Sequence, residues 1–560
     1  MDAVKAALAV DVGTAPAGAP VVDGEPVAPR PEEAAAGTLP RDPETPWLAP
    51  RWFHGLLVAG AVLTVAIGLV LRFWTRSDMW LDEALTLNIS RLPLNEIQGA
   101  LRRDGAPPLY YYLLHFWIDA FGSSDVAVRA LSGVLSCATL PFVWIAGRRL
   151  GGRTVAIGVV VLVASSPFAV RYATENRMYA LVGFLTAAGL VALQRALERP
   201  AAGNLIAVAV TASALLYSHY WSLYLIGVTA LWLAWQAWRG PIGRRPGARA
   251  ALGAVIVAGL TFLPWLPTFI YQSRHTGTPW AIPADFAALV NAVTSFAGGA
   301  TNQGRALALL YFALAGLGLF GVAGGYRHVI LDLRTRPAGR GLAIVTVGTL
   351  AAAVIGGYAS RSAFQARYAS VIFVFLTLLV ALGFATFADQ RIRAGVMAAT
   401  VAFGVAGSLP NIWTSRTQAG QVAAALAKFG QPGDVVAYCP DQLGPSVSHL
   451  LPSGRYRQLT FPRQTGPQFV NWVDYGAATA AGNPAQFALK LESLSAASHS
   501  LWYVWAPGYE TLGTKCEQIE NDMLADPAFS ARTIFPFTKV LNSDVIYEDM
   551  ELVQFVHVPR

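Results

Sequence analysis

Carboxylates and arginines stand together in the short polar segments that separate the apolar runs of this sequence. Asp82 and Glu83 follow an aromatic and apolar stretch, and Asp104 lies further along the same segment. A carboxyl group beside an apolar layer tends to have a raised pKa, because burial disfavours its charged form. Such a group suits general-base work near neutral pH. On the dipeptide alone, the alternative is that Asp82 caps the helix formed by the residues after it.

Four arginines and a histidine occupy similar segments elsewhere. They are Arg171 and Arg177 in RYATENRMY, His219 in SHYW, and Arg361 and Arg367 in SRSAFQARY. Each has a structural alternative, since arginines extend toward lipid headgroups and an interfacial histidine can be satisfied by the backbone. Because these charged residues occupy the same kind of segment as Asp82, a functional role for Asp82 is nevertheless favoured over a helix cap.

The composition shows where these segments must lie. The chain of 560 residues is 54% hydrophobic and only 13% charged, whereas soluble proteins carry about 25% charged residues. The deficit falls between residues 53 and 412, in runs long enough to cross a bilayer core, which takes about 20 apolar residues. The net charge of +8 comes almost entirely from arginine. Because these arginines lie at the ends of apolar runs, they indicate membrane orientation rather than nucleic-acid binding.

The pattern predicts an α-helical polytopic membrane protein with three parts. Residues 1–50 are rich in Ala, Pro, Gly and Glu and predict a disordered tail. Residues 51–412 form the membrane domain, with spans at 53–73, 126–147, 154–170, 178–195, 203–218, 221–238, 251–271, 305–325, 341–358, 369–388 and 394–412. Residues 413–560 form a soluble α/β or α+β domain. A twelfth span at 109–121 is an alternative, which is disfavoured because it would move the arginine-rich breaks outside.

The arginines also predict the orientation in the plasma membrane. Five arginine-rich breaks, such as those at 148–153 and 239–249, share one side of an eleven-span arrangement, and the positive-inside rule makes that side cytoplasmic. The N-terminus is then inside, and the C-terminal domain and the loop 74–125 are outside. The acids, His219 and the four arginines above lie on the opposite side, where the positive-inside rule predicts few basic residues. Charges at membrane level are costly and usually functional, so they predict a site on the outer face.

The C-terminal segment alternates short apolar runs with turns. GDVVAYC (433–439), LWYVWAP (501–507) and ELVQFVHV (551–558) are typical of buried strands, and AGQVAAALAKF (419–429) of a helix. Cys439 and Cys516 lie in this segment, and we expect them to form a disulfide if it is exported. The alternative is a pair of buried free thiols.

Five motifs together resemble one known superfamily. They are WLDEA (80–84), DGAPPLYY (104–111), ENRMYA (175–180), SHYW (218–221) and QARY (365–368). In this order and topology the chain resembles the GT-C glycosyltransferases, and within them the branch of protein O-mannosyltransferases and aminoarabinose transferases (family 39-like). The resemblance covers about residues 55 to 410.

The resemblance implies a reaction and a set of roles. Such enzymes transfer a sugar from a polyprenyl-phosphate carrier to an acceptor hydroxyl on the outer face, usually with inversion. Asp82 matches the catalytic base, Glu83 would orient the base or the acceptor, and Asp104 is a further acidic candidate. Guanidinium groups bind phosphate in a fork, so the donor phosphate would lie against the arginines, which are Arg171, Arg177, Arg361 and Arg367. Sugar and acceptor contacts would come from aromatic and imidazole groups, which are Trp80, Tyr179, His219, Tyr220 and Tyr368.

One position departs from the family pattern. Related sequences often carry His-Pro-Pro where this chain has Ala106-Pro107-Pro108, which puts a divalent metal in doubt, and no other cluster has metal-ligand spacing. The donor sugars that we expect are mannose or arabinofuranose, and the acceptor is an envelope glycolipid, polysaccharide or protein. The competing hypotheses are a flippase or transporter of a lipid-linked intermediate and a non-catalytic envelope-assembly protein.

Overall fold

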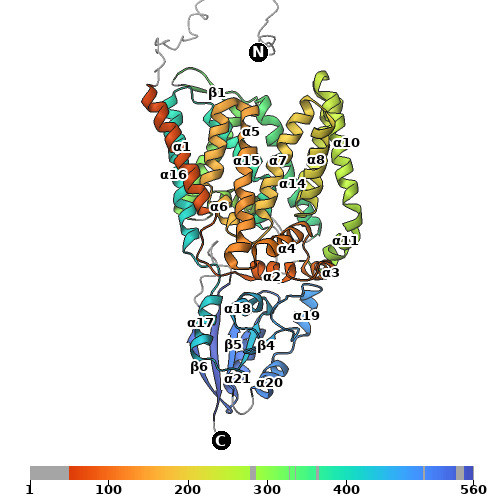
Figure 1. Ribbon diagram of the computed structural model, residues 1–560, viewed down its shortest axis with the longest axis vertical. Helices are drawn as coiled ribbons and strands as arrows, with labels where there is room; N and C mark the ends of the chain where they lie inside the picture. The colour runs from red at the N-terminus through yellow and green to blue at the C-terminus, as the bar shows by residue number, and fades with distance from the viewer. Residues whose placement is uncertain are drawn as a thin grey trace, which may run out of the picture. The chain divides into compact units, whose positions relative to one another are not determined.

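The computed structural model describes residues 50–277, 286–299, 301–326, 328–334, 336–360, 365–495, 499–537 and 548–558. The chain divides after Pro46, and Trp47–Arg560 forms one compact unit. The predicted disordered tail therefore lies, except for Pro50, outside the described residues. Within the compact unit, a bundle of helices is followed by a five-stranded sheet with its own helices (Figure 1).

Helices that run side by side, most of them long and apolar, make up the bundle (Figure 1). They are α1 (Arg51–Leu71), α5 (Asp125–Ser165), α7 (Tyr179–Glu198), α8 (Ala202–Leu216), α9 (Ser222–Arg239), α10 (Arg245–Thr261), α11 (Leu266–His275), α13 (Asn302–Phe320), α14 (Pro337–Ser360), α15 (Ser370–Phe384) and α16 (Gln390–Ser408). Within the described residues, 8 helical segments are long and apolar enough to cross a membrane. The protein is thus a multi-pass membrane protein. The eleven predicted spans fall on these helices, with two on the arms of α5 and one on α10 and α11 together. The span predicted at 305–325 is too long, because α13 ends at Phe320 and the short strand β1 (Gly321–Ala323) follows.

Two breaks divide the helices in the first half of the bundle, one at the predicted position and one within a predicted span. The arms of α5 meet at Gly151 and Gly152, and Gly152 has a φ of +74°, which glycine adopts without steric cost. The predicted span 154–170 is wrong at its end, because α5 stops at Ser165. A new helix, α6 (Pro167–Ala173), begins there, with Ser166 accepting a hydrogen bond from the Ala169 N–H at 3.3 Å. Proline at the first helical position favours such a restart.

The centre of the bundle is α15, which is buried along its whole length. A helix that is apolar on every face belongs in such a position. Its neighbour α13 approaches very closely, because a Cβ added at Gly383 would lie 2.1 Å from the Leu314 carbonyl oxygen. Only a glycine at this position permits the contact.

The predicted external loop folds into short helices at one end of the bundle, next to the sheet (Figure 1). These are α2 (Leu81–Ser90), α3 (Leu94–Asp104) and α4 (Leu109–Phe121), and α12 (Phe286–Phe296) comes from a later loop. The 13 residues of α4 are too few to cross a bilayer core of about 30 Å. The structure therefore supports the arrangement without a span at 109–121.

The C-terminal part is a mixed sheet with helices on both faces. Its order is β4-β3-β5-β7-β6, in which β3 runs parallel to β4 and β5 and β7 runs antiparallel to β5 and β6. The bounds are β3 (Val435–Cys439), β4 (Arg457–Thr460), β5 (Leu501–Trp505), β6 (Phe529–Phe535) and β7 (Glu551–His557). The helices are α17 (Ala419–Phe429), α18 (Gly444–Leu450), α19 (Tyr475–Ala481), α20 (Pro484–Leu494) and α21 (Lys515–Ala525). The predicted helix and the three predicted strands are confirmed.

Alternate residues of β3 pack on opposite sides of this sheet, as strand geometry requires. Val435 and Ala437 contact the layer of α20 and α21, and Val436 and Tyr438 contact the layer of α17 and α18. Cys439 at the end of β3 forms a disulfide with a residue of α21, Cys516, across a Cα–Cα distance of 5.5 Å. This geometry agrees with the predicted pairing rather than with the free-thiol alternative.

Candidate active site

Asp82 lies in the first turn of α2, at the end of the bundle that contacts the C-terminal part, where α2 packs against α18. Trp80 occupies the N-cap position of this helix, so the alternative in which Asp82 caps it is wrong. The Asp82 Oδ2 atom lies 3.8 Å from Nη2 of Arg177 and 3.7 Å from Nη2 of Arg367. The Asp82 side chain is 19% exposed, so a substrate can reach the carboxylate between the two guanidinium groups.

Arg177 is held in place by α2 and α4. Its Nη1 donates to Thr86 Oγ1 at 2.7 Å and to Tyr111 Oη at 3.2 Å. The Tyr111 hydroxyl in turn donates to Asp104 Oδ2 at 2.9 Å. Burial raises the pKa of Asp104 to about 6, although Arg177 and the Tyr111 hydrogen bond oppose the rise. Asp104 is therefore linked to Arg177 through the Tyr111 hydroxyl.

Arg367 stands on the other side of Asp82, in the short helix η5 (Ala366–Ala369) that leads into α15. Its Cζ lies 5.4 Å from the centre of the Trp80 ring and 5.8 Å from that of Tyr368. Aromatic faces attract a guanidinium group at such distances. These rings thus fix Arg367 beside Asp82, whereas the remaining predicted arginine, Arg361, lies outside the described residues.

His219 lies buried between Tyr179 and Tyr368, with ring centroids 5.8 Å and 5.3 Å away. Its Nδ1 accepts a hydrogen bond from the Trp221 N–H at 3.1 Å, which assigns the proton to Nε2. Burial, and then the two nearby arginines, lower the pKa of His219 to about 3. The backbone satisfies one ring nitrogen, as the structural alternative held, and the other remains a neutral hydrogen-bond donor.

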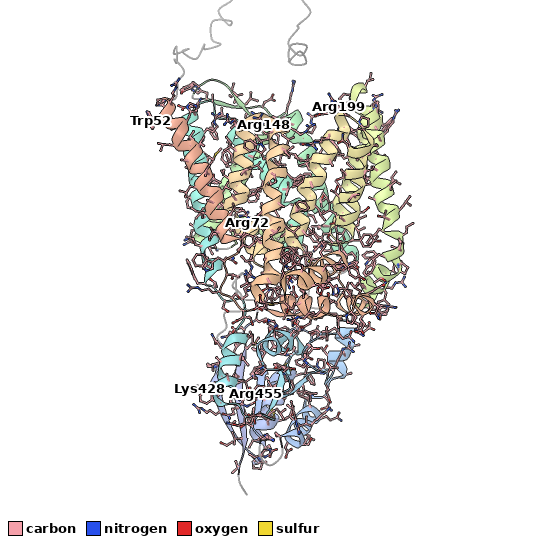
Figure 2. All side chains as sticks on the ribbon, in the orientation of Figure 1. Trp52, Arg72, Arg148, Arg199, Lys428 and Arg455 are labelled. Atoms are coloured by element: carbon pink, nitrogen blue, oxygen red, sulfur yellow. A yellow bond between two sulfur atoms is a disulfide. The ribbon has the colours of Figure 1, made fainter. Side chains whose placement is uncertain are left out.

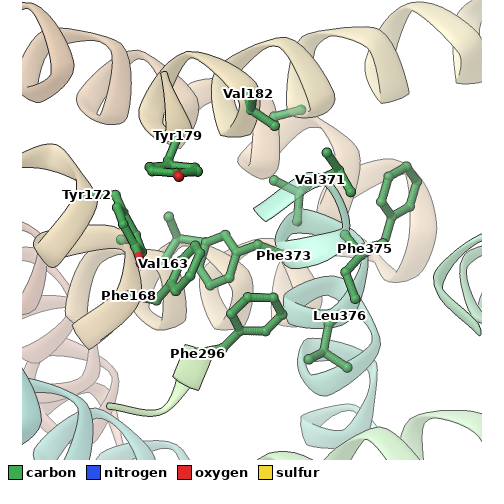
Figure 3. Close-up of a cluster of buried hydrophobic side chains, with 14 of the residues drawn as sticks. Val163, Phe168, Tyr172, Tyr179, Val182, Phe296, Val371, Phe373, Phe375 and Leu376 are labelled. Atoms are coloured by element: carbon green, nitrogen blue, oxygen red, sulfur yellow. The ribbon is translucent and has the colours of Figure 1, made fainter. Parts of the chain in front are cut away.

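Tyr179 rests on a layer of aromatic rings inside the bundle, which Figure 3 shows. Its ring lies 4.7 Å from Tyr172, and the Tyr172 ring lies 4.6 Å from Phe168. Phe168 packs against Phe373 of α15 at 5.1 Å. Close packing of this kind leaves little freedom for Tyr179, so the site has a rigid apolar floor.

Glu83 has different surroundings from Asp82, although the two are adjacent in sequence. Both of its carboxylate oxygens accept hydrogen bonds from Arg129 at 2.7 Å, and Arg416 Nη1 lies 3.5 Å away. Burial alone would raise the pKa of Glu83, but Arg129, Arg416 and the Asn176 N–H together lower it to about 2. The side chain is completely buried. It therefore offers no atom to a substrate and instead fixes α2 against α5.

Arg171 belongs to the same buried cluster. Its Nε lies 3.5 Å from Glu175 Oε2, and Arg416 Nη1 lies 4.0 Å from that oxygen. Burial raises the pKa of Glu175, and the two arginines oppose the rise. Arg171 thus pairs with Glu175 rather than with Asp82, unlike Arg177 and Arg367.

Tyr220 is predicted to contact the sugar or the acceptor, but its side chain packs against α11 and the residues before it. Its hydroxyl donates to Gln272 Oε1 and accepts from Trp265 Nε1 at 3.0 Å. Its ring packs against Phe269 at 4.8 Å. Both partners of the hydroxyl lie in or next to α11. The structure therefore does not support a sugar contact by Tyr220.

The C-terminal part contributes to the site in a way that no sequence motif indicated. Glu548 Oε1 accepts a hydrogen bond of 2.7 Å from the Leu81 N–H, at the start of α2. Trp80 and Leu81 pack against Val470 and Trp472. The first turn of a helix needs such a partner for its free N–H groups, and here a residue far away in the sequence supplies it.

The arrangement combines a reachable carboxylate, two guanidinium groups, a neutral imidazole donor and aromatic rings. Guanidinium groups suit the recognition of phosphate, and the carboxylate between them can accept a proton. Within the described part of the chain, no three His, Cys, Asp or Glu side chains gather closely enough to hold a metal ion.

A family model and solved structures match this chain. Residues 105–267 match the family of dolichyl-phosphate-mannose-protein mannosyltransferases, a segment that includes Arg177, Tyr179 and His219 but neither Asp82 nor Arg367. No curated protein sequence matches the chain.

Among solved structures, ArnT from Cupriavidus metallidurans bound to undecaprenyl phosphate is similar, with a TM-score of 0.52 and 14% identity. The match covers 91% of this chain and 100% of ArnT. The apo state of that protein gives a TM-score of 0.52 and 15% identity over 91% of this chain and 99% of the other. The Archaeoglobus fulgidus oligosaccharyltransferase in complex with Zn and sulfate gives 0.47 and 13% identity over 87% and 73%. The chain therefore has the fold of ArnT, and its segment 105–267 matches the mannosyltransferase family model, in agreement with the GT-C resemblance of its motifs.

Proposed function

We propose that this protein is a membrane glycosyltransferase that moves a sugar from a polyprenyl-phosphate carrier to an acceptor hydroxyl on the outer membrane face. The observation that carries the proposal is the position of Asp82 Oδ2, 3.8 Å and 3.7 Å from the guanidinium groups of Arg177 and Arg367. A proton acceptor flanked by two phosphate-binding groups is what this transfer needs. The family match and the ArnT fold support the same reaction class.

In the proposed reaction, the acceptor hydroxyl oxygen attacks the anomeric carbon of the sugar. Asp82 takes the proton of this hydroxyl as the bond forms. The bond from that carbon to the phosphate oxygen breaks, and the carrier leaves as lipid phosphate. Arg177 and Arg367 stabilise the charge that develops on the phosphate. Attack on the face opposite the leaving group inverts the anomeric configuration.

The surrounding groups are assigned to binding and positioning. His219, as a neutral donor, and the rings of Trp80, Tyr179 and Tyr368 would contact the sugar or the acceptor. Asp104 supports Arg177 through Tyr111. Glu83 and Arg171 are assigned to the buried charge cluster that holds α2, rather than to substrate contact.

We propose mannose or arabinofuranose on the carrier, and an envelope glycolipid, polysaccharide or protein as acceptor. We also propose that the arginine-rich end of the bundle is cytoplasmic, which places Asp82 and the C-terminal domain outside.

The test is a transfer assay in reconstituted membranes with a panel of radiolabelled polyprenyl-phosphate sugars. Wild-type protein should transfer at least one of them, and Asp82→Asn should bind this donor but not transfer it. Asp119→Asn is the matched control, because Asp119 lies in α4 with an exposed side chain. Donor binding without transfer by the wild type would contradict the proposal and favour a flippase or a non-catalytic assembly protein.

A further inference from the structure

A cavity of about 480 Å³ lies away from Asp82, between α7, α8, α9 and α14. Its volume falls in the range of about 300–1,000 Å³ that is usual for small-molecule sites. Leu190, Leu193 and Phe375 make its walls apolar, while Trp235 and Ile344 line it and are also 48% and 42% exposed. The cavity therefore opens sideways at the surface of the bundle, where membrane lipid surrounds the protein.

The depth of the cavity fits one leaflet of a bilayer. On α7 its lining runs from Thr186 to Glu198, which at 1.5 Å per residue is roughly 18 Å. Half of a hydrocarbon core of about 30 Å is similar in depth. A single acyl chain from the adjacent leaflet is an occupant of matching length and polarity.

Two polar atoms in the lining lack partners within the described residues. Thr186 Oγ1 and Gln194 Oε1 are buried without a hydrogen bond, and both residues line the cavity. A buried polar atom without a partner is costly. Gln194 Oε1 accepts hydrogen bonds and lies one helical turn from Glu198 at the rim, so a hydroxyl group of a headgroup such as phosphatidylglycerol would donate the missing contact.

The rim of the cavity is basic. Arg149, Arg244 and Arg340 line it together with a single acid, Glu198, and Arg149 forms an ion pair with Glu198. Figure 2 shows the neighbours Arg148 and Arg199 at the end of the bundle away from the sheet. This rim carries a net positive charge at the depth where lipid headgroups lie, so it complements an anionic headgroup.

We propose that this cavity is a binding site for an anionic phospholipid of the leaflet at the arginine-rich end. Its acyl chain lies between α7 and α14, and its phosphate contacts the basic rim. The proposal does not depend on the proposed function. Tyr179 at the active site and Glu198 at the rim stand at opposite ends of α7, about 28 Å apart at 1.5 Å per residue, so one phosphate cannot occupy both places.

The test uses the full-length protein, stripped of lipid and reconstituted in vesicles of equal phosphatidylglycerol and phosphatidylcholine. Lipid that stays bound after extraction is measured by native mass spectrometry. Phosphatidylglycerol should be retained in preference to phosphatidylcholine. The double variant Arg244→Gln/Arg340→Gln should retain roughly thirtyfold less, because two contacts to an anionic headgroup are lost. Arg249→Gln is the control, since Arg249 is exposed at the same end and does not line the cavity.

A second variant fills the cavity. Leu193→Trp should abolish retention, and Ile206→Trp, at an exposed position outside the cavity, should leave it unchanged. Because the double arginine variant keeps the core intact, it tests the proposal even if Leu193→Trp fails to fold. Equal retention of the two phospholipids, or full retention by the double variant, would overturn the proposal. Displacement of phosphatidylglycerol by polyprenyl phosphate would overturn it as well, since the carrier would then be the occupant.

Discussion

Replacement of Glu83 by glutamine tests whether the second acid of the WLDEA motif serves structure or chemistry. The change keeps the shape of the side chain but removes a charge that two arginines, Arg129 and Arg416, neutralise in the buried cluster. Both guanidinium groups would then be buried with one fewer counter-charge. We therefore expect a marked loss of stability with little direct effect on transfer.

The size of the loss follows from the electrostatics of Glu83. Its pKa falls from 4.5 to about 2 on folding, which at 1.36 kcal/mol per pKa unit corresponds to about 3 kcal/mol. The loss of one partner from a buried ion pair typically costs a similar amount, about 3–5 kcal/mol. Since the pKa is lowered, the stabilisation is fully present above pH 4.5 and disappears as the pH falls toward 2.

The assay is thermal unfolding in detergent, together with transfer per folded molecule. Glu83→Gln should lower Tm by several degrees at pH 7, and the difference from wild type should shrink as the pH falls below 4.5. Glu96→Gln is the matched control, because Glu96 is an exposed acid in the same loop. An unchanged Tm with transfer reduced by 10² or more, the loss typical of a missing general base, would refute this reasoning and make Glu83 a catalytic candidate.

Four further predictions follow from the geometry. Asp82→Asn should lower turnover by roughly 10² or more, because the proton acceptor is lost, with donor affinity nearly unchanged; Arg367→Ala should instead weaken donor binding, and equilibrium binding beside the transfer assay separates the two. The pKa of Asp104 is raised from 3.8 to about 6, so its contribution to stability declines as the pH rises from 4 to 6; Asp104→Asn should remove this decline from the pH dependence of Tm. Cys439→Ser opens a loop closed over 77 residues and should cost roughly 4 kcal/mol in the chain-entropy estimate, whereas maleimide labelling of both thiols in unfolded, unreduced wild type would contradict the disulfide with Cys516. A reporter that is active only outside the cytoplasm should work when fused after the last residue, and activity of a cytoplasm-only reporter there would contradict the proposed orientation.

The sequence was sufficient for features that depend on local properties. A run of apolar residues long enough to cross a bilayer forms a helix, so most spans could be predicted from composition alone, whereas the break at Ser166 within the predicted span 154–170 could not. The strands around Val435 and Leu501 could also be predicted, since they are short, apolar and bounded by turns. The motifs also predicted which residues the structure brings together at the end of the bundle, namely Asp82, Arg177 and Arg367.

Only the tertiary structure decided the surroundings of each predicted side chain. Asp82 and Glu83 are neighbours in sequence, yet one lies between two partly exposed arginines and the other is buried against Arg129 and Arg416. Arg129 is 46 positions and Arg416 is 333 positions away from Glu83, so no local pattern could indicate the cluster. Adjacent residues of a helix point about 100° apart, so Asp82 and Glu83 face different surroundings. A buried carboxylate needs charged partners, and these can come from distant parts of the chain. For this reason the sequence could locate the site, while packing determined which of its acids a substrate can reach.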